Sequence, residues 1–186
     1  EKGWGVPQGD KAAVKWYRLA AKQGFAPAQL NLGLMYGKGQ GVSKDNSIAM
    51  KWYTLAAEQG NANAKYSLGV LYEKGWGVPQ DDKTAVKWYT LAAEEGDVNA
   101  QFNLGVMYGT GQGVPLDYKI AVKWYMLAGK QGHASAQSNL GFMYRKEQGV
   151  PLDYKTAVKW YRLAAKQGSA SAQYNLGQMY RKGEGV

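Results

Sequence analysis

The chain has 186 residues, of which 45% are hydrophobic and 13% aromatic, and its formal net charge is +9 at pH 7. This hydrophobic content excludes a disordered chain, and the absence of cysteine excludes disulfides and thiolate metal sites. No apolar run approaches the roughly 20 residues that a membrane-spanning helix requires, so we expect no membrane span. The periplasm, the cytoplasm and the extracellular space all stay open as locations.

A 36-residue repeat organises the whole sequence, and its register has no insertion or deletion. Residues 1–6 are identical to residues 73–78, so we interpret them as the tail of a preceding repeat and the chain as a fragment of a longer array. The complete repeats of this single array are predicted at 7–42, 43–78, 79–114, 115–150 and 151–186. The tryptophan of each repeat shows the register: Trp16, Trp52, Trp88, Trp124 and Trp160.

The first predicted helix of each repeat covers about residues 11–23 in repeat one. At 100° per residue, one broad apolar face is predicted to form core. Its members are Ala13, Val14, Trp16, Tyr17, Ala20 and Ala21. Gly24, which can adopt positive φ, is expected to close this helix.

Aspartates precede the first helix of the later repeats and are expected to cap its free backbone N–H groups. These predicted N-caps are Asp45, Asp81, Asp117 and Asp153. Repeat one has Gly9 at this position, and repeat two has Ser43 where the other later repeats have proline, so weaker caps are expected in both.

The second predicted helix covers about residues 27–36 in repeat one, with Ala28, Leu32 and Met35 on its inner stripe. A glycine recurs in its middle, where it costs about 1 kcal/mol relative to alanine. We interpret it as allowing close approach to the backbone of the partner helix in the same repeat. The glycines are Gly33, Gly69, Gly105, Gly141 and Gly177.

A Gly-x-Gly-Val-Pro connector leads to the next repeat, and its glycines suit turns with positive φ. Glu147 replaces the first of these glycines in repeat four, which predicts local strain or a shifted turn. Trp4 and Trp76 lie in connectors, where other repeats have glutamine. Two interpretations of Trp76 stay open: a contact residue, or packing against a neighbouring turn.

The motif Ala-Val-Lys-Trp-Tyr-x-Leu-Ala-Ala-x-x-Gly (85–96), followed by Ala-Gln-x-Asn-Leu-Gly-x-Met-Tyr (100–108) and Gly-x-Gly-Val-Pro (111–115), closely resembles the Sel-one-like repeat. That family is related to tetratricopeptide repeats, and the resemblance covers essentially the whole chain. It implies an all-α fold, a right-handed α/α superhelix (solenoid) of five 36-residue helix-turn-helix repeats, with first helices lining a concave surface. It also implies an adaptor or scaffold for protein assemblies, with a bacterial source favoured. The lack of cysteine excludes the disulfide-rich subgroup.

Catalytic and cofactor signatures are weak, so the sequence predicts no enzyme, no cofactor and no metal site. His133 is the only histidine, in a turn where a capping or exposed role is expected. Glycine clusters such as residues 37–41 superficially resemble phosphate-binding loops, but no strand precedes them. The aspartates are separated by whole repeats and serve as caps. The recurrent aromatics are interpreted as core rather than as a base-stacking platform.

Positive charge is concentrated on the outward side of the first helices, in four columns of residues that recur every 36 positions and begin at Lys11, Lys15, Arg18 and Lys22 in repeat one. Together these columns carry a net charge of +12, more than the net +9 of the chain. Repeats two and three, which contain Glu58 and Glu94, carry the least of it. The predicted partner-binding residues are Lys15, Arg18, Lys22, Lys51, Lys87, Lys119, Lys123, Lys130, Lys155, Lys159, Arg162 and Lys166. A leucine column flanks them: Leu19, Leu55, Leu91, Leu127 and Leu163.

We therefore predict a scaffold that binds a protein or peptide, with an acidic partner favoured. One alternative is a solvated face that only keeps the array in solution. A second is non-specific binding to nucleic acid or another anionic surface, which the two glutamates disfavour. A third is a purely architectural spacer. A monomer is expected, with end-to-end stacking as an alternative.

Overall fold

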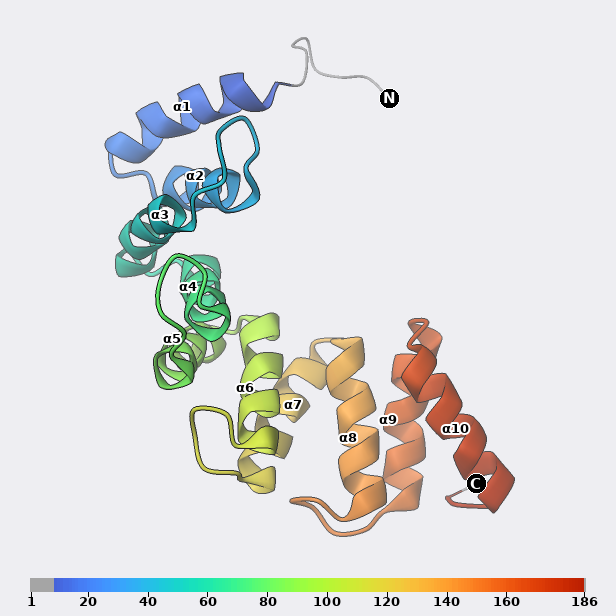
Figure 1. The fold of residues 1–186 in the computed structure, drawn as a ribbon. Helices are drawn as coiled ribbons and strands as arrows, with labels where there is room; N and C mark the ends of the chain where they lie inside the picture. The colour runs from blue at the N-terminus through green and yellow to red at the C-terminus, as the bar shows by residue number, and fades with distance from the viewer. Residues whose placement is uncertain (1–8, 186) are drawn as a thin grey trace. The chain divides into compact units, whose positions relative to one another are not determined.

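The computed structural model describes residues 9–185, and within that range it contains ten α-helices and no strand (Figure 1). The all-α prediction is confirmed. The helices are α1 (Asp10–Lys22), α2 (Ala26–Lys38), α3 (Asn46–Glu58), α4 (Ala62–Lys74), α5 (Asp82–Glu94), α6 (Val98–Thr110), α7 (Tyr118–Lys130), α8 (Ala134–Lys146), α9 (Tyr154–Lys166) and α10 (Ala170–Lys182). The predicted tail at residues 1–6, with Trp4, lies outside the described residues.

The chain divides into two compact units, Glu1–Trp88 and Tyr89–Val186, with the division inside α5. In each unit, short turns join helices into hairpins, and hairpins stack on one another. The second helix of a hairpin has a larger interface with the first helix of the next hairpin than with its own partner, as α2 has with α3 and α8 with α9. The interface between hairpins therefore organises each core.

The helix boundaries follow local chemistry, as expected. Asp45 Oδ1 accepts the Ile48 backbone N–H at 2.9 Å, and Asp81, Asp117 and Asp153 cap their helices in the same way, at 2.9–3.1 Å. Gly9 provides no side-chain cap. The weaker cap predicted for repeat two stays a prediction: Asp45 makes the same backbone bond, while Asp81 and Asp153 also accept the hydroxyls of Thr84 and Thr156.

Three of the mid-helix glycines, Gly33, Gly105 and Gly141, make room for a tyrosine ring from the next hairpin. A Cβ atom added at Gly33 would lie 2.5 Å from the Tyr53 ring, and one at Gly141 would lie 2.7 Å from the Tyr161 ring. Tyr161 is completely buried. The predicted close approach to the backbone of the partner helix in the same hairpin is therefore wrong: the glycine accommodates an aromatic side chain across the interface between hairpins.

The tryptophans are less buried than predicted. Trp52 and Trp160 are half-buried, and each packs against the core cluster of the preceding hairpin. Trp16 is 65% exposed, so its assignment to the core is wrong. Its counterparts show the reason: this side chain packs on the hairpin before its own, and none precedes α1 within residues 9–185.

A partly buried chain of side-chain amide hydrogen bonds joins neighbouring hairpins in the second unit. The Gln167 side-chain N–H donates to the Gln137 side-chain oxygen at 2.8 Å, and the Gln137 N–H donates to the Gly129 carbonyl at 2.9 Å. The same arrangement recurs at Gln131 and Gln101. Because buried polar groups are costly without partners, these bonds help to fix the register between hairpins.

The Glu147 turn keeps the geometry of its glycine counterparts. Its φ is +56°, in the left-handed region, compared with +72° for Gly39 and +75° for Gly111. Of the two predicted outcomes, local strain is therefore confirmed and a shifted turn is not, since a side chain in this region costs roughly 1–2 kcal/mol.

Candidate partner-binding surface

In each unit, the first-helix face consists of the outward residues of that unit's first helices: α1, α3 and α5 up to Trp88 in the first unit, and α7 and α9 in the second. All twelve predicted basic residues are exposed there. Five lie in the first unit, on α1, α3 and α5, and the other seven lie in the second unit, on α7 and α9. Within residues 9–185, no ion pair joins any of the twelve to a carboxylate. Their charges are therefore available to a partner.

The leucine column lies four residues after the lysine column, which consists of Lys15, Lys51, Lys87, Lys123 and Lys159. This spacing places the two columns on the same side of each helix. Its members are evenly exposed, from 43% for Leu55 to 47% for Leu19. On α3, Leu55 joins Met50, Lys51 and Thr54 around a shallow depression of about 350 Å³. The face therefore offers apolar contact beside positive charge.

Two of the predicted basic residues are held by their own hairpin. The Arg18 guanidinium donates to the Tyr36 hydroxyl at 2.9 Å, and Arg162 donates to the Tyr180 hydroxyl with its guanidinium carbon 5.8 Å from the ring centroid. Each tyrosine belongs to the second helix. These contacts orient the arginines, whose remaining N–H groups can still bind a carboxylate.

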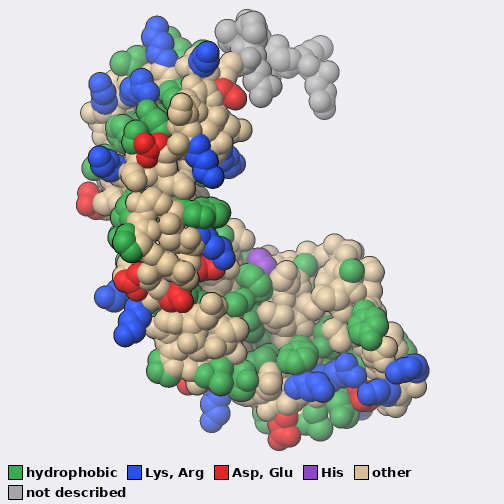
Figure 2. All heavy atoms as spheres, in the orientation of Figure 1, with side chains coloured by type: hydrophobic (Ala, Val, Ile, Leu, Met, Phe, Trp, Pro, Cys, Tyr) green, Lys and Arg blue, Asp and Glu red, His purple; other side chains and the backbone are tan. Residues whose placement is uncertain are grey.

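Positive charge is not confined to the first-helix face. Figure 2 shows Lys and Arg side chains over the ends of α8 to α10 as well. Lys146 lies in the last turn of α8, and Arg181 and Lys182 lie in the last turn of α10. The periodicity of the sequence predicts the larger group of basic residues, on the first helices, but not this smaller group on the second helices.

The repeat pattern does not predict a second feature of the structure, a pair of cavities between hairpins. The first is about 260 Å³ and is lined by residues of α2, α3, α4 and the connector at Trp76. The second is about 320 Å³ and includes Gly109, Tyr125 and Gln148. Gly37 and Gly109 occupy the same repeat position, where repeat four has Arg145. A glycine in place of this large side chain is the feature of the sequence that indicates each cavity.

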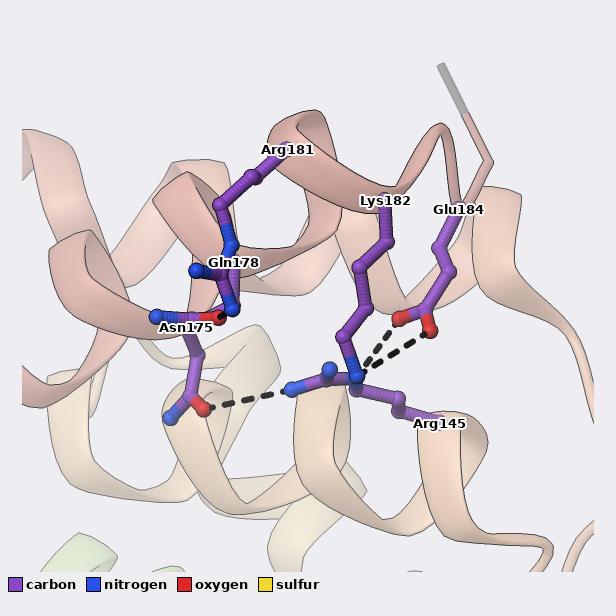
Figure 3. A network of polar contacts seen from close by, with 6 residues as sticks. All are labelled: Arg145, Asn175, Gln178, Arg181, Lys182 and Glu184. Atoms are coloured by element: carbon purple, nitrogen blue, oxygen red, sulfur yellow. Dashed lines mark hydrogen bonds and ion pairs between the residues drawn. The ribbon is translucent and has the colours of Figure 1, made fainter.

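Arg145 fills the corresponding place between α8, α9 and α10 (Figure 3). Its Nε donates to Glu184 Oε2 at 2.9 Å and its Nη1 to Asn175 Oδ1 at 3.5 Å. The Arg145 and Glu184 side chains are only 13% and 20% exposed. Lys182 lies 4.0 Å from the same carboxylate. An arginine side chain thus occupies in one hairpin pair a space that is open in two others.

A buried tyrosine lies beside each of the two cavities and beside the equivalent space that Arg145 fills. Burial raises the pKa of Tyr53, Tyr125 and Tyr161 to about 12 in each case. Hydrogen bonds with Ser67 and Asn139 partly offset this effect at Tyr53 and Tyr125. The neutral hydroxyl is the form present at physiological pH, so these tyrosines supply polarity without charge.

His133 is a helix cap, as expected. Its Nδ1 accepts the Ala136 backbone N–H at 3.2 Å, and its ring stacks on Phe102 with centroids 4.4 Å apart. Desolvation by burial lowers its pKa. Within the described residues, no group of three His, Cys, Asp or Glu side chains could hold a metal ion, and no helix is long and apolar enough to cross a membrane.

The stacked hairpins define a class of helical repeat proteins that expose elongated surfaces. Matches to the Sel1 repeat model cover the chain at residues 1–25, 26–61, 62–97, 98–133, 134–169 and 170–186. The chain belongs to the Sel1 repeat family, and its fold is that family's all-α solenoid with a repeat of about 36 residues.

Solved structures agree with this assignment. The protective antigen c5321 of uropathogenic Escherichia coli, which has an SLR fold, is 46% identical with a TM-score of 0.91. The match covers 93% of this chain but 37% of that antigen. A Sel1 repeat protein from Oxalobacter formigenes is 42% identical with a TM-score of 0.86, over 98% of this chain and 72% of that one.

More distant relatives share the fold with lower similarity. Helicobacter pylori cysteine rich protein B is 27% identical with a TM-score of 0.52, over 66% of this chain and 93% of that one. The immunity protein PA5088 of Pseudomonas aeruginosa is 26% identical with a TM-score of 0.55, over 87% of this chain and 58% of that one. Among curated proteins, no sequence matches this chain.

Proposed function

We propose that this chain binds an acidic, leucine-rich protein or peptide segment along the first-helix face, without catalysis. Sel1 repeat proteins generally act as scaffolds for protein–protein interaction. The observation that supports an acidic, leucine-rich partner is that the lysine column, which makes no ion pair within residues 9–185, lies beside the column of half-exposed leucines. Charge complementarity guides and orients a partner, while apolar contact adds affinity.

Nucleic acid is the weaker candidate. Positive charge alone gives sequence-independent attraction to phosphate, but single-strand binding also uses exposed aromatic rings for base stacking. On α7 and α9, Tyr125 and Tyr161 are at most 5% exposed, and Tyr118 and Tyr154 are only partly exposed. Carboxylates at Glu58 and Glu94 also interrupt the basic columns.

The test is a fluorescence-anisotropy titration with a labelled peptide of alternating glutamate and leucine, at about 0.05 and 0.15 M salt. Reversing Lys123 and Lys159 to glutamate should raise the Kd at least about fourfold, since each exposed pair contributes about 0.2–1 kcal/mol and its reversal adds repulsion. Reversing Lys146 and Arg181, on second helices of the same unit, changes the net charge equally and should have a smaller effect.

Single- and double-stranded DNA and RNA are titrated in parallel. Equal losses of peptide affinity in the two double variants would show attraction to net charge only and would refute the proposed face. Tighter binding of nucleic acid than of the peptide at 0.15 M salt would favour the alternative. Absence of binding to every probe would support the architectural role.

A further inference from the structure

The cavity beside Gly37 results from a missing side chain. A Cβ atom added there would lie 3.5 Å from the Tyr53 hydroxyl and 3.9 Å from the Ala49 Cβ, ordinary contact distances. A side chain at this position is therefore tolerated, and Arg145 shows one in place at the equivalent position of repeat four (Figure 3). Glycine leaves the space open in repeat one.

The walls of this cavity are mainly apolar. Leu34, Val70, Leu71 and the Tyr53 ring line it, together with Trp76, which has 48% of its surface exposed. Its volume of about 260 Å³ lies just below the 300–1,000 Å³ usual for small-molecule sites. The cavity therefore suits one large side chain better than a cofactor.

The charge around the cavity selects the partner. Lys38 is the one charged residue that lines it within the described part of the chain. Lys44 adds a second positive charge at the rim, 5.6 Å from the centre of the Trp76 ring. The counterpart of Glu184, which neutralises Arg145 in repeat four, is Trp76. An arginine would therefore find repulsion here, whereas an aromatic ring would find a stacking surface.

We propose that the cavity beside Gly37 binds an aromatic side chain of a partner protein, with a neighbouring carboxylate of that partner paired to Lys38. Trp76 serves as an anchor of the kind enriched at binding hot spots. The site is separate from the first-helix face and does not depend on the function proposed for that face. The cavity beside Gly109 lacks both features, since Thr110 and Gln148 replace Lys38 and Trp76.

The test uses a blocked peptide, acetyl-Gly-Glu-Phe-Gly-amide, titrated into ¹⁵N-labelled protein while the tryptophan indole N–H signals are recorded by NMR. We expect one indole signal to shift, and the Trp76→Gln variant to identify it, because glutamine is the residue at this position in repeats one, three and four. Gly37→Met should fill the cavity without adding charge and weaken binding about tenfold or more.

Matched variants separate the contributions. Lys38→Gln should weaken binding about two- to fivefold, as expected for one exposed ion pair. Gly109→Met should leave the affinity unchanged, and a peptide with lysine in place of glutamate should not shift the signal. No shift at millimolar peptide, or equal affinity in wild type and Gly37→Met, would overturn the proposal whatever the first-helix face binds.

Discussion

Gly141 and Gly177 occupy the same helical position in α8 and α10 but have different surroundings. A Cβ atom at Gly141 would meet three Tyr161 ring atoms at 2.7–2.8 Å, whereas one at Gly177 would meet nothing within 4 Å. Alanine improves helix propensity by about 1 kcal/mol at either site, and forced overpacking of a buried ring costs about 1–3 kcal/mol. Gly177→Ala should therefore stabilise the protein, and Gly141→Ala should be about 1–3 kcal/mol less stable than Gly177→Ala.

The assay is thermal unfolding followed by circular dichroism at 222 nm. For a chain of this length, 1 kcal/mol corresponds to roughly 2–4 °C, so the Tm of Gly141→Ala should lie about 2–12 °C below that of Gly177→Ala. Combining Gly141→Ala with Tyr161→Leu should show positive coupling, because the smaller side chain relieves the clash. Equal rises in Tm for both single variants would refute the assignment of Gly141 as a seat for the tyrosine ring.

Three further changes test individual contacts. Burial lowers the pKa of His133 below its ordinary 6.5. Its contribution to stability is therefore complete above about pH 6.5 and is lost as pH falls through the folded pKa. His133→Asn, which introduces the cap residue found at Asn61, should flatten the pH dependence of the unfolding free energy, measured in urea between about pH 5 and 7. Gln137→Leu should lower the free energy of unfolding by about 1–3 kcal/mol, more than the same change at exposed Gln173, because it leaves the buried Gly129 carbonyl without its partner; equal losses would contradict the amide chain. Glu147→Gly should raise the Tm by relieving roughly 1 kcal/mol of left-handed strain, and a lower Tm would argue against it.

Features with local causes could be predicted from the sequence. The aspartate caps, the connector turns and the strain at Glu147 depend on residues a few positions apart, so periodicity and φ preferences were sufficient. The lysine and leucine columns followed from helix geometry alone. Their exposure in the structure agrees with that geometry, and their role in binding stays a prediction.

Features that depend on contact between hairpins could not be predicted in the same way. The sequence showed that Gly33 and its equivalents recur, but only packing reveals that a tyrosine of the next hairpin occupies the space. The apolar helical face of Trp16 predicts a core position, but its counterparts Trp52 and Trp160 pack on the hairpin before their own, and none precedes α1 within residues 9–185. The cavity beside Gly37 arises because glycine has no side chain to fill the space. The structure shows this only by comparison with Arg145, which fills the equivalent space in repeat four.

The most direct test of the proposed binding face is a methyl NMR titration of leucine-labelled protein with the glutamate–leucine peptide. Leu127 and Leu163, exposed on α7 and α9, should shift together and saturate with one Kd. Leu152, which is 47% exposed but lies outside the helices, and fully buried Leu140 should not. Shifts at Leu152 with none at Leu127 and Leu163 would contradict binding along the first-helix face.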